Sequence, residues 1–439
     1  MQSGPDLRNR QEGQPTEAPP SLQRVLGLTE VTAGGLGIII GAGIYVLLGA
    51  ATAYAGPLVW LAFLMAALLS ALTGLSYAEL SSMFPSAAGE YEYTRRALPE
   101  WIAFVVGWTM IVGLVVAAAT VSIGFGRYVG FFVNVDPRAA ALVLLMTVSL
   151  VATAGIKQSA RITVGLSVVQ VGGLVLVVAI GLPHIGDVDL FGGADPAGVF
   201  SAAALVFFAF IGFDEVITLA EETKDPTRTV PRALLLALGL STLLYVAVAV
   251  AAVSVLGSAA LATSSRPLAE VMAHVLGARG ATVVAVIAVL TTTNTTLLAL
   301  TAGSRVIYGM AKAGAMPPAL AKVHRRRGTP MHATMIAVLV AGAFAAVGDF
   351  TVIAAVTDFA VYIVFLAVNA TVIILRRTRP ELPRPFAVPG AIRGVPVVPL
   401  LGLGSVTLMM TQLESAAIAL GSAICVAGLI AGWLVRSRR

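Results

Sequence analysis

The sequence has few charged residues and almost no cysteine. Only 11% of its 439 residues are charged, whereas soluble globular domains average about 25%. The single cysteine, Cys425, excludes an internal disulfide framework and a metal site built from cysteines. A secreted disulfide-rich domain and a soluble enzyme of ordinary composition are therefore both disfavoured.

The sequence also lacks the motifs of catalysis. It contains no glycine-rich nucleotide-binding loop, no cluster of metal ligands and no nucleophile paired with a base. We therefore expect that the protein is not an enzyme, and we predict no cofactor and no metal site. No signal peptide is predicted, because no charged segment leads into a short apolar segment and a cleavage site. The four histidines fall in predicted loops or at predicted helix ends: His184, His274, His324 and His332.

Hydrophobic residues, in contrast, are abundant. They make up 58% of the chain, and the mean hydropathy is +0.93. Apolar runs of about 20 residues, the length that crosses a bilayer, recur along the sequence, which predicts an all-α polytopic membrane protein with about 12 transmembrane helices. The hydrophilic residues 1–24 are predicted to form a disordered cytosolic tail. The predicted spans are 31–55, 58–84, 98–127, 138–155, 161–182, 198–221, 232–256, 280–312, 331–348, 351–376, 395–412 and 415–435.

The basic residues indicate the orientation of the predicted helices. With the N-terminus in the cytosol, all but four of the 28 Lys and Arg residues fall in predicted cytosolic segments. Because basic residues are enriched in cytosolic loops, we predict a multi-pass protein of the cell (cytoplasmic) membrane with both termini in the cytosol. The net charge of +6 then reflects topology and does not indicate a nucleic-acid partner. The four exceptions are Arg127, Arg138, Arg266 and Arg279.

Two of the predicted spans are interrupted by glycine. The first interruption is Ile38–Tyr45, and the second is Phe208–Glu215. Lipid cannot satisfy the backbone groups that such a break exposes, so breaks are tolerated only inside protein or beside a watery cavity. If spans 1–5 and 6–10 form two halves, the broken helices correspond and run in opposite directions. Matched breaks of this kind indicate the binding site of a transporter built from inverted repeats.

The ends of the broken helices suit a zwitterionic amino acid. The N–H groups that begin a half-helix carry partial positive charge, and the carbonyls that end one carry partial negative charge. The alternative is that the glycines only allow close helix packing. The candidate substrate-binding groups are the N–H groups of Gly41, Ala42 and Gly43 and the carbonyls of Ile39, Phe208 and Ile211.

Polar residues within the spans leave alternatives open. Asp214, just past the second break, either caps the following half-helix or carries a proton or cation. The run Thr291–Thr296 offers oxygen atoms that suit either sodium or interhelical hydrogen bonds. Asp358 is expected near the outer end of its helix.

Taken together, several segments resemble the amino acid–polyamine–organocation (APC) permeases. The nearest branch resembles bacterial relatives of the cationic amino acid transporters. Each segment alone is weakly specific, but together they cover most of the chain. They are Gly41–Ile44, Phe208–Asp214 with Ala220–Pro226, Pro85–Tyr93, Arg305–Pro317 and Leu375–Pro389.

This resemblance implies an APC/LeuT-like fold with helices 1 and 6 broken. In such a fold a 5+5 inverted repeat is followed by two C-terminal helices, which places the first repeat at 25–182, the second at 183–376 and helices 11 and 12 at 377–439. The resemblance also implies amino-acid uptake by alternating access. Phe208 or Phe210 would then close the pocket over the substrate.

Two positions depart from the pattern of the family. Related permeases have a lysine in the fifth span that replaces a sodium ion and takes part in proton coupling, and Gln170 aligns with it here. Three modes therefore stay open: sodium at the threonine run, including Thr295; protons through Asp214; or uncoupled exchange. Arginine-handling relatives have an aromatic residue near the substrate side chain, whereas Leu298 occupies that position here and favours a neutral substrate.

The sequence therefore predicts a secondary active transporter that imports neutral L-amino acids with proton or sodium coupling. A cationic amino acid or polyamine permease and an exchanger are the alternatives. A different class of function is a transporter-like sensor, which binds an amino acid without moving it. The predicted partners are the amino acid and the lipid bilayer, with no nucleic acid, and the oligomeric state stays open.

Overall fold

The structure is a computed structural model, and it is almost entirely helical. The predicted tail at 1–24 and part of the Pro85–Tyr93 segment lie outside the described residues. Two short strands, β1 (Ala391–Ile392) and β2 (Val395–Pro396), form the one antiparallel pair that the described residues contain. The structure describes residues 26–84, 89–154, 157–192, 196–324, 329–392 and 395–437.

The helices follow the apolar runs of the sequence. Eight stretches are long and apolar enough to cross a membrane, and four shorter apolar helices accompany them within the described residues. The first part of the chain forms α1 (Leu28–Ile39), α2 (Gly43–Ala55), α3 (Val59–Met83), α4 (Gly89–Ala97), α5 (Glu100–Val129), α6 (Pro137–Ala154) and α7 (Lys157–Gly181). The remainder forms α8 (Pro196–Val206), η3 (Phe207–Phe210), η4 (Asp214–Glu222), α9 (Pro226–Leu256), α10 (Ser258–Thr263), α11 (Pro267–Lys312), η5 (Pro318–Ala321), α12 (Met331–Val347), α13 (Phe350–Thr378), α14 (Val397–Thr411) and α15 (Ser415–Ser437).

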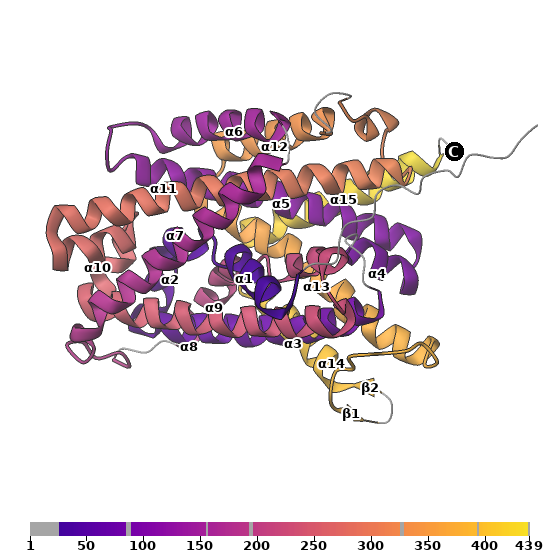
Figure 1. Cartoon of the computed structure of the whole chain (residues 1–439), viewed down its shortest axis with the longest axis horizontal. Coiled ribbons are helices and arrows are strands. Elements are labelled where there is room, and N and C mark those ends of the chain that lie inside the picture. The colour runs from indigo at the N-terminus through magenta and orange to yellow at the C-terminus, as the bar shows by residue number, and fades with distance from the viewer. Residues whose placement is uncertain are drawn as a thin grey trace, which may run out of the picture.

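The long helices pack side by side in two groups. In the view of Figure 1, α3, α8 and α9 lie along one side, and α5, α6, α11 and α12 lie along the opposite side. Helix α9 packs along α3, and α11 packs along α5. Between the groups lie α1, which packs on α9, and α2, which packs on α8. The first interrupted span therefore lies between the two groups, and its second half contacts the second interrupted span through α8.

Both predicted breaks are present in the backbone. Helix α1 ends at Ile39, and α2 begins at Gly43, so three residues separate the two halves of the first interrupted span. In the second, α8 passes into the 3₁₀ turn η3, and the chain then reverses at Gly212, whose φ is 113°. Only glycine adopts this φ without strain, which explains its presence at this turn. The segment that follows, η4, is a 3₁₀ helix and not an α-helix.

The helix at 280–312 extends further towards the N-terminus than its predicted span. Helix α11 begins at Pro267 and contains a kink at Gly277, where φ is 67°. The segment before the kink buries Leu268, Val271 and Met272 at helical spacing. It has the amphipathic pattern of a helix that packs on a bundle with one face.

A buried ion-pair network ties the end of α13 to α3. Glu79, with a side chain only 1% exposed, accepts hydrogen bonds from the guanidinium of Arg376 and from the backbone N–H of Val388 at 2.8 Å. Arg384 approaches the same carboxylate at 3.4 Å. Because a buried carboxylate needs opposite charge and hydrogen bonds, these contacts fix the connection that follows α13 against α3.

Candidate functional site

The two breaks lie in direct contact at the centre of the bundle. A Cβ atom on Gly43 would lie 2.6 Å from the Cα atom of Ala209, and one on Gly212 would lie 3.3 Å from the carbonyl oxygen of Ile38. Real Cβ atoms do not approach a backbone atom as closely as 2.6 Å, so glycine at position 43 is needed for the two segments to touch, and the 3.3 Å contact at Gly212 is tight. The first and second interruptions therefore form one structural unit, although more than 160 residues separate Gly43 from Ala209.

A tyrosine on α9 holds both breaks. The hydroxyl of Tyr245 lies 2.8 Å from the carbonyl oxygen of Ile39 and 3.0 Å from that of Ala209, and it donates towards both. Its ring packs against Phe210, with the centroids 5.2 Å apart. These carbonyls lack helical partners because their helices are interrupted, so the Tyr245 hydroxyl supplies the missing donor.

Gln170 on α7 caps the end of α1 in the same way. Its side-chain amide nitrogen donates to the carbonyl of Gly37 at 3.0 Å and also to that of Ile40. The backbone carbonyl of Gln170 accepts a hydrogen bond from the hydroxyl of Tyr45 at 2.9 Å. The amide must present its NH₂ group here, since its oxygen would face two carbonyl oxygens. Gln170 thus binds the negative end of α1 as a neutral donor.

Not every backbone N–H group at the first break is open to a ligand. The N–H of Gly41 donates to the Ile39 carbonyl at 2.8 Å, and that of Ala42 donates to Oγ1 of Thr295 at 3.2 Å. The next N–H groups, from Gly43 to Tyr45, form the first turn of α2. A first turn has no acceptors within its own helix and carries the positive end of the helix dipole, so these groups are the natural anion donors.

A small cavity of about 60 Å³ lies between the breaks. Eight of the predicted residues line it, and the walls are otherwise mostly apolar. Helix α5 contributes Leu114, Ala117 and Val121, which the sequence analysis missed although their spacing of three and four residues is that of one helical face. The predicted residues in the lining are Ile39, Gly41, Ala42, Gly43, Phe208, Ile211, Thr295 and Leu298.

Three predicted residues lie outside this lining. Phe210 is fully buried against Tyr245, so Phe208, of the two candidate lids, is the one at the cavity. Gln170 lies behind the first break, where its amide caps α1. Asp214 is also buried, and its Oδ1 accepts a hydrogen bond from the N–H of Gly212 at 3.0 Å. That donor precedes Asp214, whereas a capping side chain accepts from the residues that follow it, so the bond holds the turn at the break and both alternatives for Asp214 stay predictions.

Glu215 is the acidic residue that lines the cavity. From the sequence, its neighbour Asp214 was preferred, because Asp214 is closer to the break. Glu215 lines the cavity together with Gly212, and its backbone N–H donates to the Gly212 carbonyl at 3.1 Å across the turn that leads into η4. Nothing in the sequence distinguishes the two adjacent acids in this respect.

The threonine run of α11 mostly bonds within its own helix. The hydroxyls of Thr292, Thr293 and Thr296 donate to backbone carbonyls of the preceding turn at 2.7 to 2.8 Å. Thr295 differs, because its Oγ1 reaches Ala42 at the first break. Within this run, Thr295 therefore joins α11 to the candidate site.

Asp358 is fully buried in α13 and does not lie at an exposed helix end. Neither of its carboxyl oxygens has a hydrogen-bond partner within the part of the chain that the structure describes. Asp358 does not line the cavity between the breaks, so the structure gives it no place in the candidate site.

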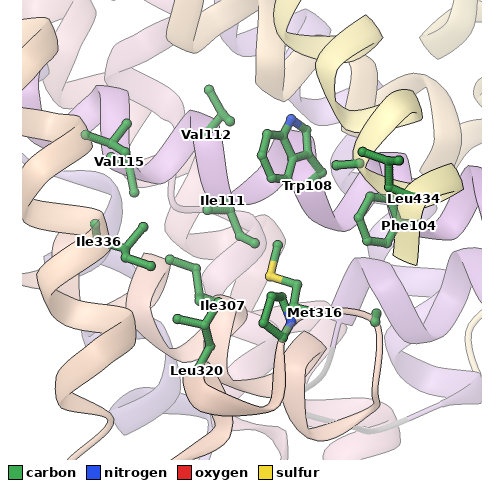
Figure 2. A pocket seen from close by; sticks show the side chains of 15 residues that line it. Phe104, Trp108, Ile111, Val112, Val115, Ile307, Met316, Leu320, Ile336 and Leu434 are labelled. Carbon is green, nitrogen blue, oxygen red and sulfur yellow. The ribbon is translucent and has the colours of Figure 1, made fainter. Parts of the chain in front are cut away.

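A second cavity is larger but has the wrong chemistry for a zwitterion. It measures about 450 Å³, and Figure 2 shows that the labelled side chains around it are apolar or aromatic. The Trp108 side-chain N–H is already donated to the Ile424 carbonyl at 3.1 Å. An ammonium and a carboxylate would lose their hydration there without gaining hydrogen bonds. The candidate site is therefore the smaller cavity at the breaks.

Comparison with known proteins identifies the family. The amino acid permease family model matches residues 26–435, which is nearly the whole chain. The chain belongs to the amino acid permease family. Its resemblance to the APC superfamily is thereby confirmed, and the permease is a multi-pass membrane protein devoted to amino acid transport.

Characterised relatives of the permease transport different solutes. It is 32% identical to the branched-chain amino acid permease BcaP of Bacillus subtilis, over 90% of this chain and 91% of the relative. It is 29% identical to the methylthioribose transporter of the same bacterium, over 88% of this chain and 87% of the relative. It is 31% identical to the vacuolar cationic amino acid transporter 2 of Arabidopsis thaliana, over 82% of this chain and 61% of that longer relative.

Proposed function

We propose that the permease imports small or medium-sized neutral L-amino acids across the cell membrane by alternating access, with proton coupling. The observation that carries this proposal is the cavity between the two breaks. There, the first turn of α2, the backbone of the second break and apolar side chains surround one small volume. This combination fits an ammonium, a carboxylate and an apolar side chain held close together.

The substrate carboxylate is assigned to the first turn of α2. The N–H groups of Gly41 and Ala42 already have acceptors, so the N–H of Gly43 and the two that follow are the donors we propose. Glycine at position 43 lets Ala209 of the second break pack against the start of α2, which brings the two halves of the site together. The positive end of the α2 dipole adds a favourable interaction with the anionic group.

The substrate ammonium is assigned to the second break. The Ile39 carbonyl already accepts from Gly41 and Tyr245, which uses both of its lone pairs. Phe208, Ile211 and Glu215 line the same cavity, and we assign the acceptors to the backbone carbonyls of the first two and the carboxylate of the third. A charged acceptor strengthens the binding of an ammonium group relative to carbonyls alone.

Neutral side chains are favoured by the rest of the lining. The lining contains four side chains that form no hydrogen bond with a polar side chain: Leu298, Leu114, Ala117 and Val121. The branched-chain specificity named for one relative agrees with such a wall. Glu215 supports the competing proposal of a cationic substrate, which another relative is named for. Competition of lysine and of leucine against the same labelled substrate separates the two proposals.

Proton coupling is preferred over sodium coupling because of Gln170. A sodium ion is held by several oxygen atoms, among them backbone carbonyls. The amide of Gln170 already donates to the carbonyls of Gly37 and Ile40 at the first break, which leaves fewer acceptors there for a cation. Acidic side chains at the second break supply groups that bind protons, so a pH gradient is the driving force we propose.

The architecture proposed from the family is a pair of inverted repeats at 25–182 and 183–376, followed by helices 11 and 12. In its support, one broken span begins each proposed repeat, and the broken spans meet at the site. Twelve spans, with both termini in the cytosol, are supported by the distribution of Lys and Arg residues.

The proposal is tested in proteoliposomes with labelled leucine. Uptake is expected with an inward proton gradient, and Leu298→Trp is expected to abolish it by filling the cavity. Leu339→Trp is the matched control, because Leu339 is 69% exposed on α12 and is expected to tolerate the larger ring. Normal uptake by Leu298→Trp would contradict the assigned site. Binding of leucine without any flux would instead support a sensor.

A further inference from the structure

Three carboxyl groups connect the candidate site to the helix α4. Glu215 lines the cavity, Asp214 is buried beside it, and Glu90 lies on α4. The three groups are near enough to interact electrostatically with one another. The sequence analysis treated the segment around Glu90 only as part of a family motif and gave this glutamate no role.

Glu90 is joined to the second break through a tyrosine. The hydroxyl of Tyr77, on α3, donates to Oε1 of Glu90 at 3.1 Å. The ring of Tyr77 packs edge-on against Phe213 and against Phe365 on α13, with centroids 5.7 Å apart in each pair. Phe213 directly precedes Asp214, so a hydrogen bond and packed rings connect Glu90 with the second break.

An unsatisfied hydroxyl lies beside the same carboxyl. Tyr93 is fully buried one helical turn after Glu90, and its hydroxyl has no hydrogen-bond partner among the described residues. It is also near enough to interact electrostatically with Glu90. A buried hydroxyl rarely lacks a partner, and this one is placed to bond a carboxyl or a water molecule that moves a proton.

The charges around Glu90 make its protonation sensitive near neutral pH. Burial, together with the neighbouring Asp214 carboxyl, raises the pKa of Glu90 to about 7. The nearby basic groups are engaged by other acids: Arg305 of α11 interacts with Glu215, Arg95 and Arg96 pair with Glu92, and Arg376 and Arg384 pair with Glu79. No cation within the described residues therefore forms an ion pair with Glu90 itself.

We propose that Glu90 is the residue that holds the coupling proton on the cytosolic side, and that the proton reaches it from Glu215 by way of Asp214. This inference rests on the proposed proton-coupled uptake. In each cycle one proton from the outer side binds Glu215 and passes to Asp214 and then to Glu90, which leaves Glu215 as a carboxylate that accepts from the substrate ammonium. Transfer breaks one O–H bond and forms another at each carboxyl, and Glu90 releases the proton to the cytosol. One proton enters for each substrate.

The proton also controls the electrostatic interaction between α4 and η4. When Glu90 is protonated, it is neutral and does not repel Asp214 and Glu215, so α4 keeps its place beside α3 and α13. When the proton leaves, three carboxylates interact in a poorly solvated region, and their repulsion favours separation of α4 from the second break. Loss of the proton therefore favours opening on the cytosolic side, which couples proton release to substrate release.

The test compares Glu90→Gln with Glu92→Gln in proteoliposomes. Glu92 lies two residues along α4, but its carboxylate pairs with Arg96 at 2.7 Å near the surface. With a pH difference of one unit, the wild type and Glu92→Gln should accumulate labelled substrate up to about tenfold. Glu90→Gln should accumulate none. It should still exchange labelled for unlabelled substrate when both sides are loaded, because exchange needs no net proton movement.

Two further measurements distinguish a proton-carrying role of Glu90 from a structural role. Glu90→Asp retains a titratable carboxyl and should restore accumulation in part, which a merely structural role would not require. The rate of exchange by the wild type should change with internal pH around neutrality, and that change should disappear in Glu90→Gln.

A failure of the role of Glu90 and a failure of the proposed function give different results in these experiments. Full accumulation by Glu90→Gln, with normal exchange, would overturn the role of Glu90 and leave the proposed function intact. Wild-type protein that exchanges substrate but never responds to a pH gradient would overturn proton coupling, and with it this inference. Loss of both exchange and substrate binding in Glu90→Gln, with Glu90→Asp equally inactive, would show a structural role and would also count against the proposal.

Discussion

The side-chain amide of Gln170 donates a hydrogen bond to the backbone carbonyl of Gly37, 3.0 Å away. The same NH₂ group serves the Ile40 carbonyl, so one neutral side chain satisfies the end of α1 at the first break. A lysine in this place would make the same contacts with a charge that depends on its surroundings. The glutamine makes these hydrogen bonds, but its side chain neither gains nor loses a proton.

Gln170→Leu should destabilise the permease, because two buried carbonyls would lose their donor. An unsatisfied buried polar group costs roughly 1 to 3 kcal/mol. We expect a lower melting temperature in detergent and loss of transport. Gln412→Leu is the control, since Gln412 is partly exposed and its amide contacts only the neighbouring Thr411 side chain among the described residues. Equal melting temperatures for Gln170→Leu and the wild type would contradict the capping role.

Tyr245→Phe should remove the hydrogen bonds that join the two breaks while leaving the core packed. The variant keeps the ring that packs on Phe210 but loses the hydroxyl that bonds the carbonyls of Ile39 and Ala209. Loss of such a hydrogen bond costs about 0.5 to 1.5 kcal/mol, with more when the acceptor stays buried. We expect a modest fall in stability and a larger fall in substrate affinity, measured by binding of labelled substrate.

Tyr54→Phe provides the comparison for this variant. The Tyr54 hydroxyl bonds Glu414 at 2.9 Å, and the residue is 39% exposed. Its removal should change neither stability nor affinity appreciably. If both variants behave alike, the bridging role assigned to Tyr245 is wrong.

The stability of the protein should fall as pH rises through neutrality, in part because of Glu90. Its pKa is raised to about 7 in the folded protein, above the usual value for glutamate, because of burial and of Asp214. The folded state therefore binds this proton more tightly than the unfolded state, so the stabilisation is present at low pH and is lost as pH rises through about 7. The melting temperature of the wild type should drop between pH 5 and pH 8 more steeply than that of Glu90→Gln. A parallel decline in both proteins would exclude this contribution.

Arg376→Met should be among the most destabilising single changes. It leaves the Glu79 carboxylate, 1% exposed, without its closest cation. Breaking a buried ion pair from one side typically costs about 3 to 5 kcal/mol. The double variant Glu79→Gln/Arg376→Met should recover part of this loss, because no uncompensated charge is then buried. Arg377→Met, at an exposed neighbouring position, should have little effect on the melting temperature.

The sequence predicted the breaks but not what holds them together. Glycine is unfavourable within a helix, so the sequence predicts interruptions at Gly41, Gly43 and Gly212. Tyr245 reaches Ile39 across 206 residues, and no local pattern links the two. Pairings over such distances depend on how the helices pack, which the spacing of apolar residues within one helix does not determine.

The sequence alone also did not show which acidic residue lines the cavity. Asp214 and Glu215 are adjacent, and which one faces the cavity depends on the winding of the segment that contains them. An α-helix and a 3₁₀ helix turn successive residues by 100° and 120°, respectively, on average. Apolar periodicity over so few residues does not distinguish these two states. Phe208 and Phe210 raise the same difficulty at η3, where only Phe208 lines the cavity.

The winding of η4 has a mechanical consequence. The segment holds nine residues as a 3₁₀ helix, although such runs rarely exceed three or four residues. As a 3₁₀ helix it spans about 18 Å, and the same residues wound as an α-helix would span about 13.5 Å. Relaxation to the commoner form would draw its far end inward by roughly 4.5 Å, the difference between those lengths. A change from a 3₁₀ helix to an α-helix would therefore shorten the segment that joins the substrate cavity to α9.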